Sequence, residues 1–233
     1  MGHQPVRLCA VRRETVTTLL EATVVHIMLA YSGLAIAVAI GIPLAVLSLR
    51  SRTAGVIIST ITGIGQAIPI LALVAFMVPL AGIGFLPSVL VIVVSTLMPI
   101  VRNTYAGISS VDPELADAAA GIGLTWTETV TKVRVPLSLH AIFSGIKFSS
   151  IIANGVAIVT VLIGSGGLGV IVLRGLARFY VPEILIGILP AIAITLIADY
   201  CLSRLETMLT PPPLREKNPL IPHPAGTGTL ANR

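Results

Sequence analysis

The sequence predicts an all-α membrane protein with about five transmembrane helices. Of its 233 residues, 55% are hydrophobic and only 11% are charged, whereas a soluble domain carries about 25% charged residues. Three long runs, at 22–49, 53–101 and 148–173, contain no Asp, Glu, Lys or Arg. A membrane-spanning helix needs roughly 20 mostly apolar residues. The chain therefore has enough apolar length for several spans and too little polar surface for a water-exposed body.

The five spans are expected where charge is absent or rare. The run 53–101 is too long for one helix and fits two, because turn-forming residues gather between Pro79 and Pro87. We predict a tight hairpin there. The last span has the shortest charge-free core, from Ile184 to Ala198. The predicted spans are 23–49, 55–79, 86–108, 137–163 and 182–204.

The two ends of the chain differ in composition from the spans. Residues 1–22 mix charged and apolar positions, which is typical of an amphipathic segment in the membrane interface. Residues 209–233 are rich in Pro, Gly, Thr and Asn and have little to bury, so we expect a disordered tail. The transmembrane domain is then residues 23–208.

Glycine and proline residues recur within the predicted spans. Small residues let helices approach closely, and membranes tolerate proline kinks. Close packing alone can explain any one of these residues, whereas the whole set suits a bundle that changes shape. They are Gly33, Gly41, Pro43, Gly63, Gly65, Pro69, Pro99, Gly145, Gly155, Gly187 and Pro190.

A polar segment separates the third and fourth spans. Asp112 followed by Pro113 is a favourable N-cap and first helical residue, so a helix is expected over 113–120. Gly121 and Gly123 should end it. If this segment is cytoplasmic, more Lys and Arg residues fall inside than outside. That preference places the N-terminus outside and the C-terminus in the cytoplasm.

A second short helix should follow in the same segment. Thr125 can cap it, we expect it to extend through Thr131, and Pro136 should sit at the start of the fourth span. The result is a helix–turn–helix at the membrane surface. Its alanines make it thin enough to enter a groove on a partner.

These residues resemble the EAA loop of binding-protein-dependent ABC importer permeases, a cytoplasmic coupling-helix loop. The family pattern is Glu-Ala-Ala, three residues, Gly, nine residues and Ile-x-Leu-Pro. Asp117 replaces the Glu, and Val133 and Val135 replace Ile and Leu. In the family, this loop sits in a cleft of the ATPase subunit and transmits its closure to the membrane. The resemblance implies a coupling role for Asp117, Ala118, Ala119, Gly121, Gly123 and Pro136.

Four further stretches, at 65–69, 79–84, 97–108 and 162–169, are similar to the osmoprotectant branch of these importers. That branch imports glycine betaine, choline, carnitine and similar quaternary amines. The resemblance covers about residues 19–208. It implies a transport subunit in the lipid of the bacterial cytoplasmic (inner) membrane, and not an enzyme. Its implied partners are an ABC ATPase dimer, an extracytoplasmic substrate-binding protein and a second permease copy, identical or paralogous.

The glycine-rich stretch 164–169 lacks the Gly-Lys-Ser/Thr of a phosphate-binding loop. We therefore expect no cofactor in this chain, with ATP and Mg²⁺ on the partner ATPase, and no nucleic-acid partner. Alternatives remain open. The chain could import another small solute such as an amino acid, or form a channel or scaffold that needs no ATPase. An intramembrane enzyme is disfavoured, because we identify no nucleophile–base pair and no metal-ligand set.

Two polar residues within the fourth span are candidates for the translocation pathway. A charge inside a membrane is costly and is a functional candidate by default. Lys147 either serves the pathway, snorkels, or pairs with Asp199 or a carbonyl group. Asn154 either lines the pathway or hydrogen-bonds to a neighbouring helix. His140 is expected to be interfacial.

Overall fold

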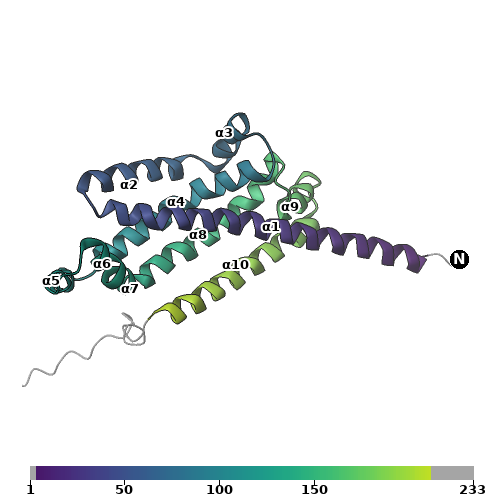
Figure 1. The fold of residues 1–233 in the computed structure, drawn as a ribbon. Helices are drawn as coiled ribbons and strands as arrows, with labels where there is room; N and C mark the ends of the chain where they lie inside the picture. The colour runs from purple at the N-terminus through teal and green to yellow at the C-terminus, as the bar shows by residue number, and fades with distance from the viewer. Residues whose placement is uncertain (1–3, 211–233) are drawn as a thin grey trace, which may run out of the picture.

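The computed structural model describes the backbone of residues 4–210 and the side chains of residues 18–210. The described chain is built from helices and turns, which confirms the all-α prediction (Figure 1). Most of the predicted tail lies outside the described residues. The elements are α1 (Gln4–Ser48), α2 (Arg52–Ala67), α3 (Ile70–Ala81), α4 (Phe85–Ser109), α5 (Pro113–Gly121), α6 (Trp126–Thr129), the π-helix η1 (Val130–Arg134), α7 (Val135–Leu137), α8 (Leu139–Val159), the 3-10 helix η2 (Thr160–Ile163), α9 (Leu168–Ala177) and α10 (Val181–Leu209).

The centre of the bundle is formed by α1, α4 and α8. A Cβ atom on Gly33 would lie 2.6 Å from Ile92 Cγ2, and one on Gly41 would lie 2.8 Å from Ile100 Cγ2. Only glycine therefore lets α1 and α4 approach this closely. Small residues set the spacing of the core. Its buried apolar side chains include Leu29, Ala30, Leu34, Val91, Ile92, Ile100, Ala153 and Val156.

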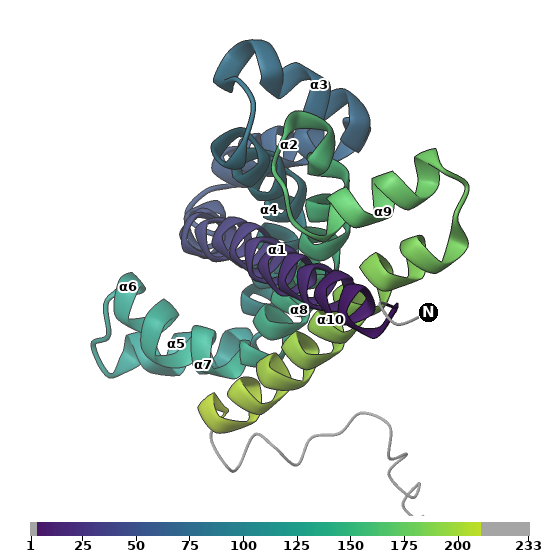
Figure 2. The ribbon, with the colours of Figure 1, turned by 90° about the vertical axis from the view of Figure 1, so that its right-hand side faces the viewer.

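Among the described residues, four helical segments are long and apolar enough to cross a membrane, and the number is five if a bent pair of helices is counted as one span. Each of the four corresponds to a predicted span. They are Thr18–Ser48, Phe85–Ser109, Leu139–Ile163 and Val181–Leu209. In two views, α2 and α3 lie on one side of α1 and α10 lies on the other (Figures 1 and 2).

The predicted second span, 55–79, is not one straight helix. It is divided into α2 and α3, which meet at an angle of 100°. Ile68 is extended (φ −70°, ψ 126°) and Pro69 follows it. Proline disfavours the helical conformation of the residue before it and has no N–H to donate. The chain therefore turns at Pro69 instead of continuing through the bundle.

The turns at the end of the bundle remote from α5 are built on glycine. The predicted hairpin is present between α3 and α4, where Gly82 and Gly84 have φ values of 79° and 109°. The Gly84 N–H donates to the Ile163 carbonyl at 2.6 Å and ties this turn to the end of η2. After the next glycine turn, the chain forms α9, a short apolar helix that is absent from the predicted spans.

The N-terminal segment 1–22 was predicted as a separate unit. From Gln4 onward it forms the first part of α1, with no helix break before Ser48. Its position in the membrane interface stays a prediction.

Candidate functional site

The segment between α4 and α8 begins with the predicted cap. The Asp112 carboxylate accepts a hydrogen bond from the Glu114 N–H at 2.9 Å, and Pro113 is the first helical residue of α5. An N-cap acceptor satisfies a backbone donor that a helix cannot satisfy itself. Helix α5 ends at Gly121, one residue beyond the predicted end.

The two glycines that follow the alanines have different roles at the end of α5. Gly123 has a φ of 87°, in the region that glycine alone adopts freely. Its N–H donates to the Ala120 carbonyl at 2.9 Å, and the Leu124 N–H donates to the Ala119 carbonyl at 3.1 Å. This pair of bonds is a Schellman motif, a common way to end a helix. Gly121, predicted as a second stop, is instead the last residue of α5, so Gly123 ends the helix alone.

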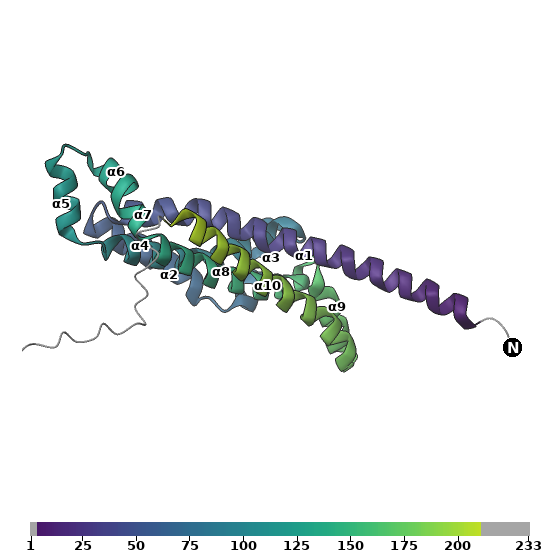
Figure 3. The ribbon, with the colours of Figure 1, turned by 90° about the horizontal axis from the view of Figure 1, so that it is seen from below.

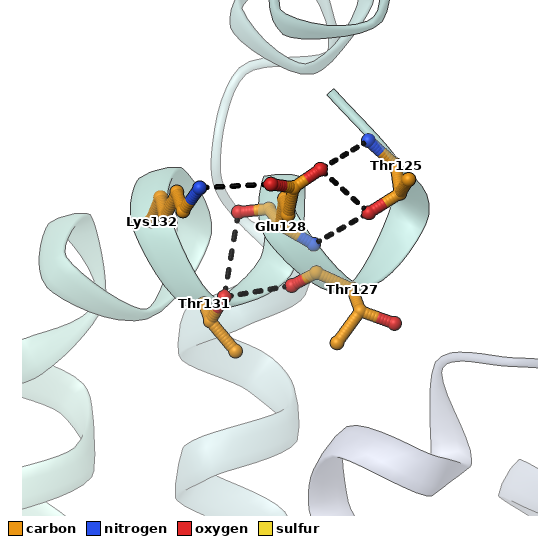
Figure 4. A network of polar contacts seen from close by, with 5 residues as sticks. All are labelled: Thr125, Thr127, Glu128, Thr131 and Lys132. Atoms are coloured by element: carbon orange, nitrogen blue, oxygen red, sulfur yellow. Dashed lines mark hydrogen bonds and ion pairs between the residues drawn. The ribbon is translucent and has the colours of Figure 1, made fainter. Parts of the chain in front are cut away.

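Thr125 caps α6 as predicted, and its side chain and that of Glu128 form a reciprocal capping box (Figure 4). The Glu128 carboxylate accepts bonds from the Thr125 N–H at 3.0 Å and the Lys132 Nζ at 2.8 Å. Lys132 and then Thr125 lower the pKa of Glu128 to about 2. Glu128 is therefore ionised at neutral pH, the state that closes the box.

The second helix does not stop at Thr131 as predicted. It continues through η1 and α7 as far as Leu137. Pro136 lies inside α7 and not at the start of α8, so its predicted position was also wrong. A proline has no N–H to donate to the residue four before it. The adjacent π-turn, in which the Val135 N–H donates to the Val130 carbonyl, rearranges the bonding around it. A short break at Ser138 separates α7 from α8.

The 113–137 segment projects from one end of the bundle, at the opposite end from α9 (Figure 3). Of the predicted coupling residues, Asp117 and Ala118 are exposed, whereas Ala119 is only 5% exposed. Ile122, in the turn, is 81% exposed, and Trp126 is half exposed. Two alanines, Ala116 and Ala119, thus face inward, whereas Ala118, Ile122 and Trp126 face outward. A folded segment with such a face can bind a complementary groove.

Lys147 pairs with Glu206 and not with Asp199, one of the partners that the sequence suggested. The Lys147 Nζ lies 2.6 Å from Glu206 Oε2, and His140 Nδ1 lies 2.7 Å from Glu206 Oε1. Asp199 is exposed on α10, about two turns before Glu206. The His140 side chain is 89% exposed. Glu206 lies 59 residues after Lys147 in the chain, so no local spacing could have revealed the pair.

Asn154 forms a hydrogen bond to a neighbouring helix, which was one of its two expected roles. Its Nδ2 donates to the Tyr31 hydroxyl of α1 at 2.9 Å and to the Ser150 carbonyl at 2.9 Å. The side chain is buried between α1 and α8. The hydrogen bond to a neighbouring helix is therefore present, whereas a role in the pathway stays a prediction.

Most of the chain, including the 113–137 segment, matches a known protein family. The family described as the binding-protein-dependent transport system inner membrane component matches residues 37–212. The chain belongs to this family. The match includes the whole 113–137 segment and every helix from α2 to α10. The protein is therefore a multi-pass membrane permease subunit.

Several members of this family with assigned transport roles are similar over most of the chain. The choline transport system permease protein OpuBB of Bacillus subtilis is 37% identical, covering 83% of this chain and 89% of the relative. The carnitine transport permease protein OpuCB of Listeria monocytogenes is 32% identical, covering 85% and 91%. The osmoprotectant import permease protein OsmW of Salmonella typhimurium is 33% identical, covering 84% and 94%.

Solved structures of ABC transporters share the fold. A chain of the inward-facing MetNI methionine ABC transporter superposes with a TM-score of 0.76 at 18% identity, covering 85% of this chain and 99% of that one. An amino acid ABC transporter crystallised with histidines gives a TM-score of 0.62 at 16% identity, covering 89% and 98%. At these identities the likeness shows the fold alone.

Proposed function

We propose that this permease is the membrane subunit of an ABC importer for osmoprotectant-type quaternary amines such as glycine betaine, choline and carnitine. The observation that carries the proposal is the 113–137 segment. It is folded by its own caps, exposes a bulky apolar face and leads through Ser138 into α8. Because of this connection, a displacement of the segment is transmitted directly to the bundle. The solute class is supported by the relatives named above, which transport choline, carnitine or osmoprotectants.

ATP hydrolysis takes place on a separate ATPase subunit in this proposal. Two ATPase subunits bind ATP and Mg²⁺, and each receives one 113–137 segment in a surface groove. Two permease subunits, identical or paralogous, surround the passage. Much of α10 is exposed, as a helix that meets lipid or a second permease would be. The 113–137 segment and the C-terminus lie in the bacterial cytoplasm, and the N-terminus lies outside.

Solute selection is assigned to an extracytoplasmic binding protein. Quaternary ammonium groups are usually held by several aromatic rings, and only 4% of this chain is aromatic. Trp126, its single tryptophan, lies in the 113–137 segment and not between the spans. The passage through the permease therefore needs only weak affinity, because the binding protein delivers the solute.

Uptake by proteoliposomes tests this proposal. The permease is reconstituted with its ATPase and binding protein, and accumulation of labelled glycine betaine, choline and carnitine is measured with ATP and with a non-hydrolysable analogue. We expect accumulation only with ATP. Intact, stimulated ATPase activity without uptake of any of the three would exclude the solute class and direct the search to amino acids. Passive flux without ATP would contradict the importer and favour a channel.

A further inference from the structure

Helix α10 is attached to the bundle by different means at its two ends. Its two buried residues, Gly187 and Ala191, both lie in its first half. Gly187 approaches α9 so closely that a Cβ atom there would lie 2.6 Å from Val172 Cγ2. The second half is largely exposed, including Leu196 and Met208. Full burial of α10 residues is thus confined to the end of the helix near α9.

At the other end of α10, a carboxylate joins the helix to α8. Each oxygen of Glu206 has its own partner on α8, the Lys147 ammonium at 2.6 Å and the His140 imidazole at 2.7 Å. These partners are seven residues apart, so the contact extends over roughly 10 Å of α8. The side chains of Glu206 and Lys147 are only 13% and 23% exposed. Removing one partner of such a shielded pair destabilises the folded structure, because the remaining charge is left in a poorly solvated place without a counter-charge.

The position of this contact links it to the 113–137 segment. His140 lies in the first turn of α8, directly after α7 and Ser138. A displacement of the segment therefore acts on the beginning of α8, as it does on the end of α4. We propose that Glu206 is a positioning residue that makes the end of α10 carrying it move as one unit with α8. This inference rests on the proposed function, because it assigns a second path by which ATPase motion reaches the spans.

A distance measurement tests the contact independently of transport. Spin labels are placed at Ser144 and Met208, both exposed, with Cys9 and Cys201 replaced by serine and labelled protomers diluted with unlabelled ones. We expect one narrow distance population in the permease alone, and its loss in Glu206→Gln. In the assembled complex, the wild-type distance should stay the same with and without an ATP analogue. A wild-type distance that changes with nucleotide, or a Glu206→Gln distance that stays narrow, would overturn the proposal.

The second measurement is the coupling ratio, the amount of solute imported per ATP hydrolysed. We expect Glu206→Gln to lower this ratio by at least about tenfold while ATPase activity is retained. Lys147→Arg should keep the ratio, and the exchanged pair Lys147→Glu with Glu206→Lys should restore part of it. A role in folding alone would lower the amount of protein and not the ratio. An unchanged ratio in Glu206→Gln would overturn the proposal.

The same helix offers a matched control. Glu183, at the other end of α10, lies 3.7 Å from both Arg174 and Arg178. Glu183→Gln removes a carboxylate whose two cationic partners, Arg174 and Arg178, do not belong to α8, and it should keep both the narrow distance and the ratio. If the wild-type complex imports no solute, the proposed transport function is contradicted. The distances measured in the permease alone still show whether Glu206 holds α10 against α8.

Discussion

In the 113–137 segment, side chains form hydrogen bonds with backbone groups a few residues away, whereas in the core of α1, α4 and α8 shape depends on helices distant in sequence. Asp112 and Thr125 cap their own helices, and Glu128 closes a box with Thr125. In the core, Gly33 matters because Ile92 of another helix lies against it. The caps and turns of the segment are thus locally determined and most of its residues are exposed, whereas the core is determined by packing and buried. A change in one region should leave the other intact.

The largest expected effect comes from Gly123→Asp in the segment. Gly123 has a φ of 87° and no atom near its absent Cβ, so the variant suffers backbone strain and adds a charge to the exposed face. We expect uptake to fall by at least about 30-fold, the equivalent of one interface hot spot of about 2 kcal/mol. Uptake is measured at equal amounts of protein in the membrane. Normal uptake would exclude a coupling role for Gly123.

Gly33→Ala tests the opposite region. The new Cβ would lie 2.8 Å from Ile92 Cβ, which belongs to a branched side chain that cannot swing away. Overpacking of this kind costs about 1–3 kcal/mol, and each kcal/mol lowers Tm by about 2–4 °C in a chain of this size. Gly63→Ala, where nothing lies within 4 Å, is the control and should not lower Tm. Equal Tm values for both variants would contradict the packing argument.

Asn154→Leu decides between the two roles of that residue. The substitution removes the hydrogen bond to the Tyr31 hydroxyl, and such bonds in membranes contribute about 0.6 kcal/mol on average. We expect a Tm decrease of about 1–3 °C, with uptake per folded molecule unchanged. A tenfold loss of uptake at unchanged Tm would instead place Asn154 in the translocation pathway.

Thr125→Ala should weaken the segment without affecting the bundle. Loss of an N-cap costs about 1 kcal/mol, here confined to α6 and η1. Hydrogen exchange of the backbone amides of residues 126–134 should quicken by roughly fivefold, while the amides of α4 and α8 keep their rates. Faster exchange throughout the chain would show that the two regions are not independent.

The pH dependence of the capping box is the smallest effect. The Glu128 pKa is about 2 in the folded segment, below its ordinary value of 4.5, because of Lys132 and Thr125. The stabilisation is therefore complete above about pH 4.5 and is lost as the pH falls towards 2. Carboxyl NMR of labelled Glu128 should show no titration between pH 7 and 5. Lys132→Met should raise the pKa, and an unchanged value would exclude the ion pair as its main cause.

The difference between the two regions also explains what could be predicted from the sequence. Asp112, Gly123 and Thr125 act on their own neighbours, so their roles were readable from local spacing. The spans were readable from hydropathy. The sharp turn at Pro69 was not, because proline is tolerated in many membrane helices. Glu206 was missed because its partners are far away in the chain, and the helix α9 was missed because it is too short to give a spanning signal.

The independence of the two regions is tested most directly by measuring the ATPase that co-purifies with the permease, together with the Tm of the permease. Gly123→Asp and Gly33→Ala are compared with the wild type. We expect Gly123→Asp to lose most of the ATPase at an unchanged Tm, and Gly33→Ala to keep its ATPase per folded molecule at a lowered Tm. Gly123→Asp that retains as much ATPase as the wild type would contradict the assignment of the 113–137 segment as the docking element.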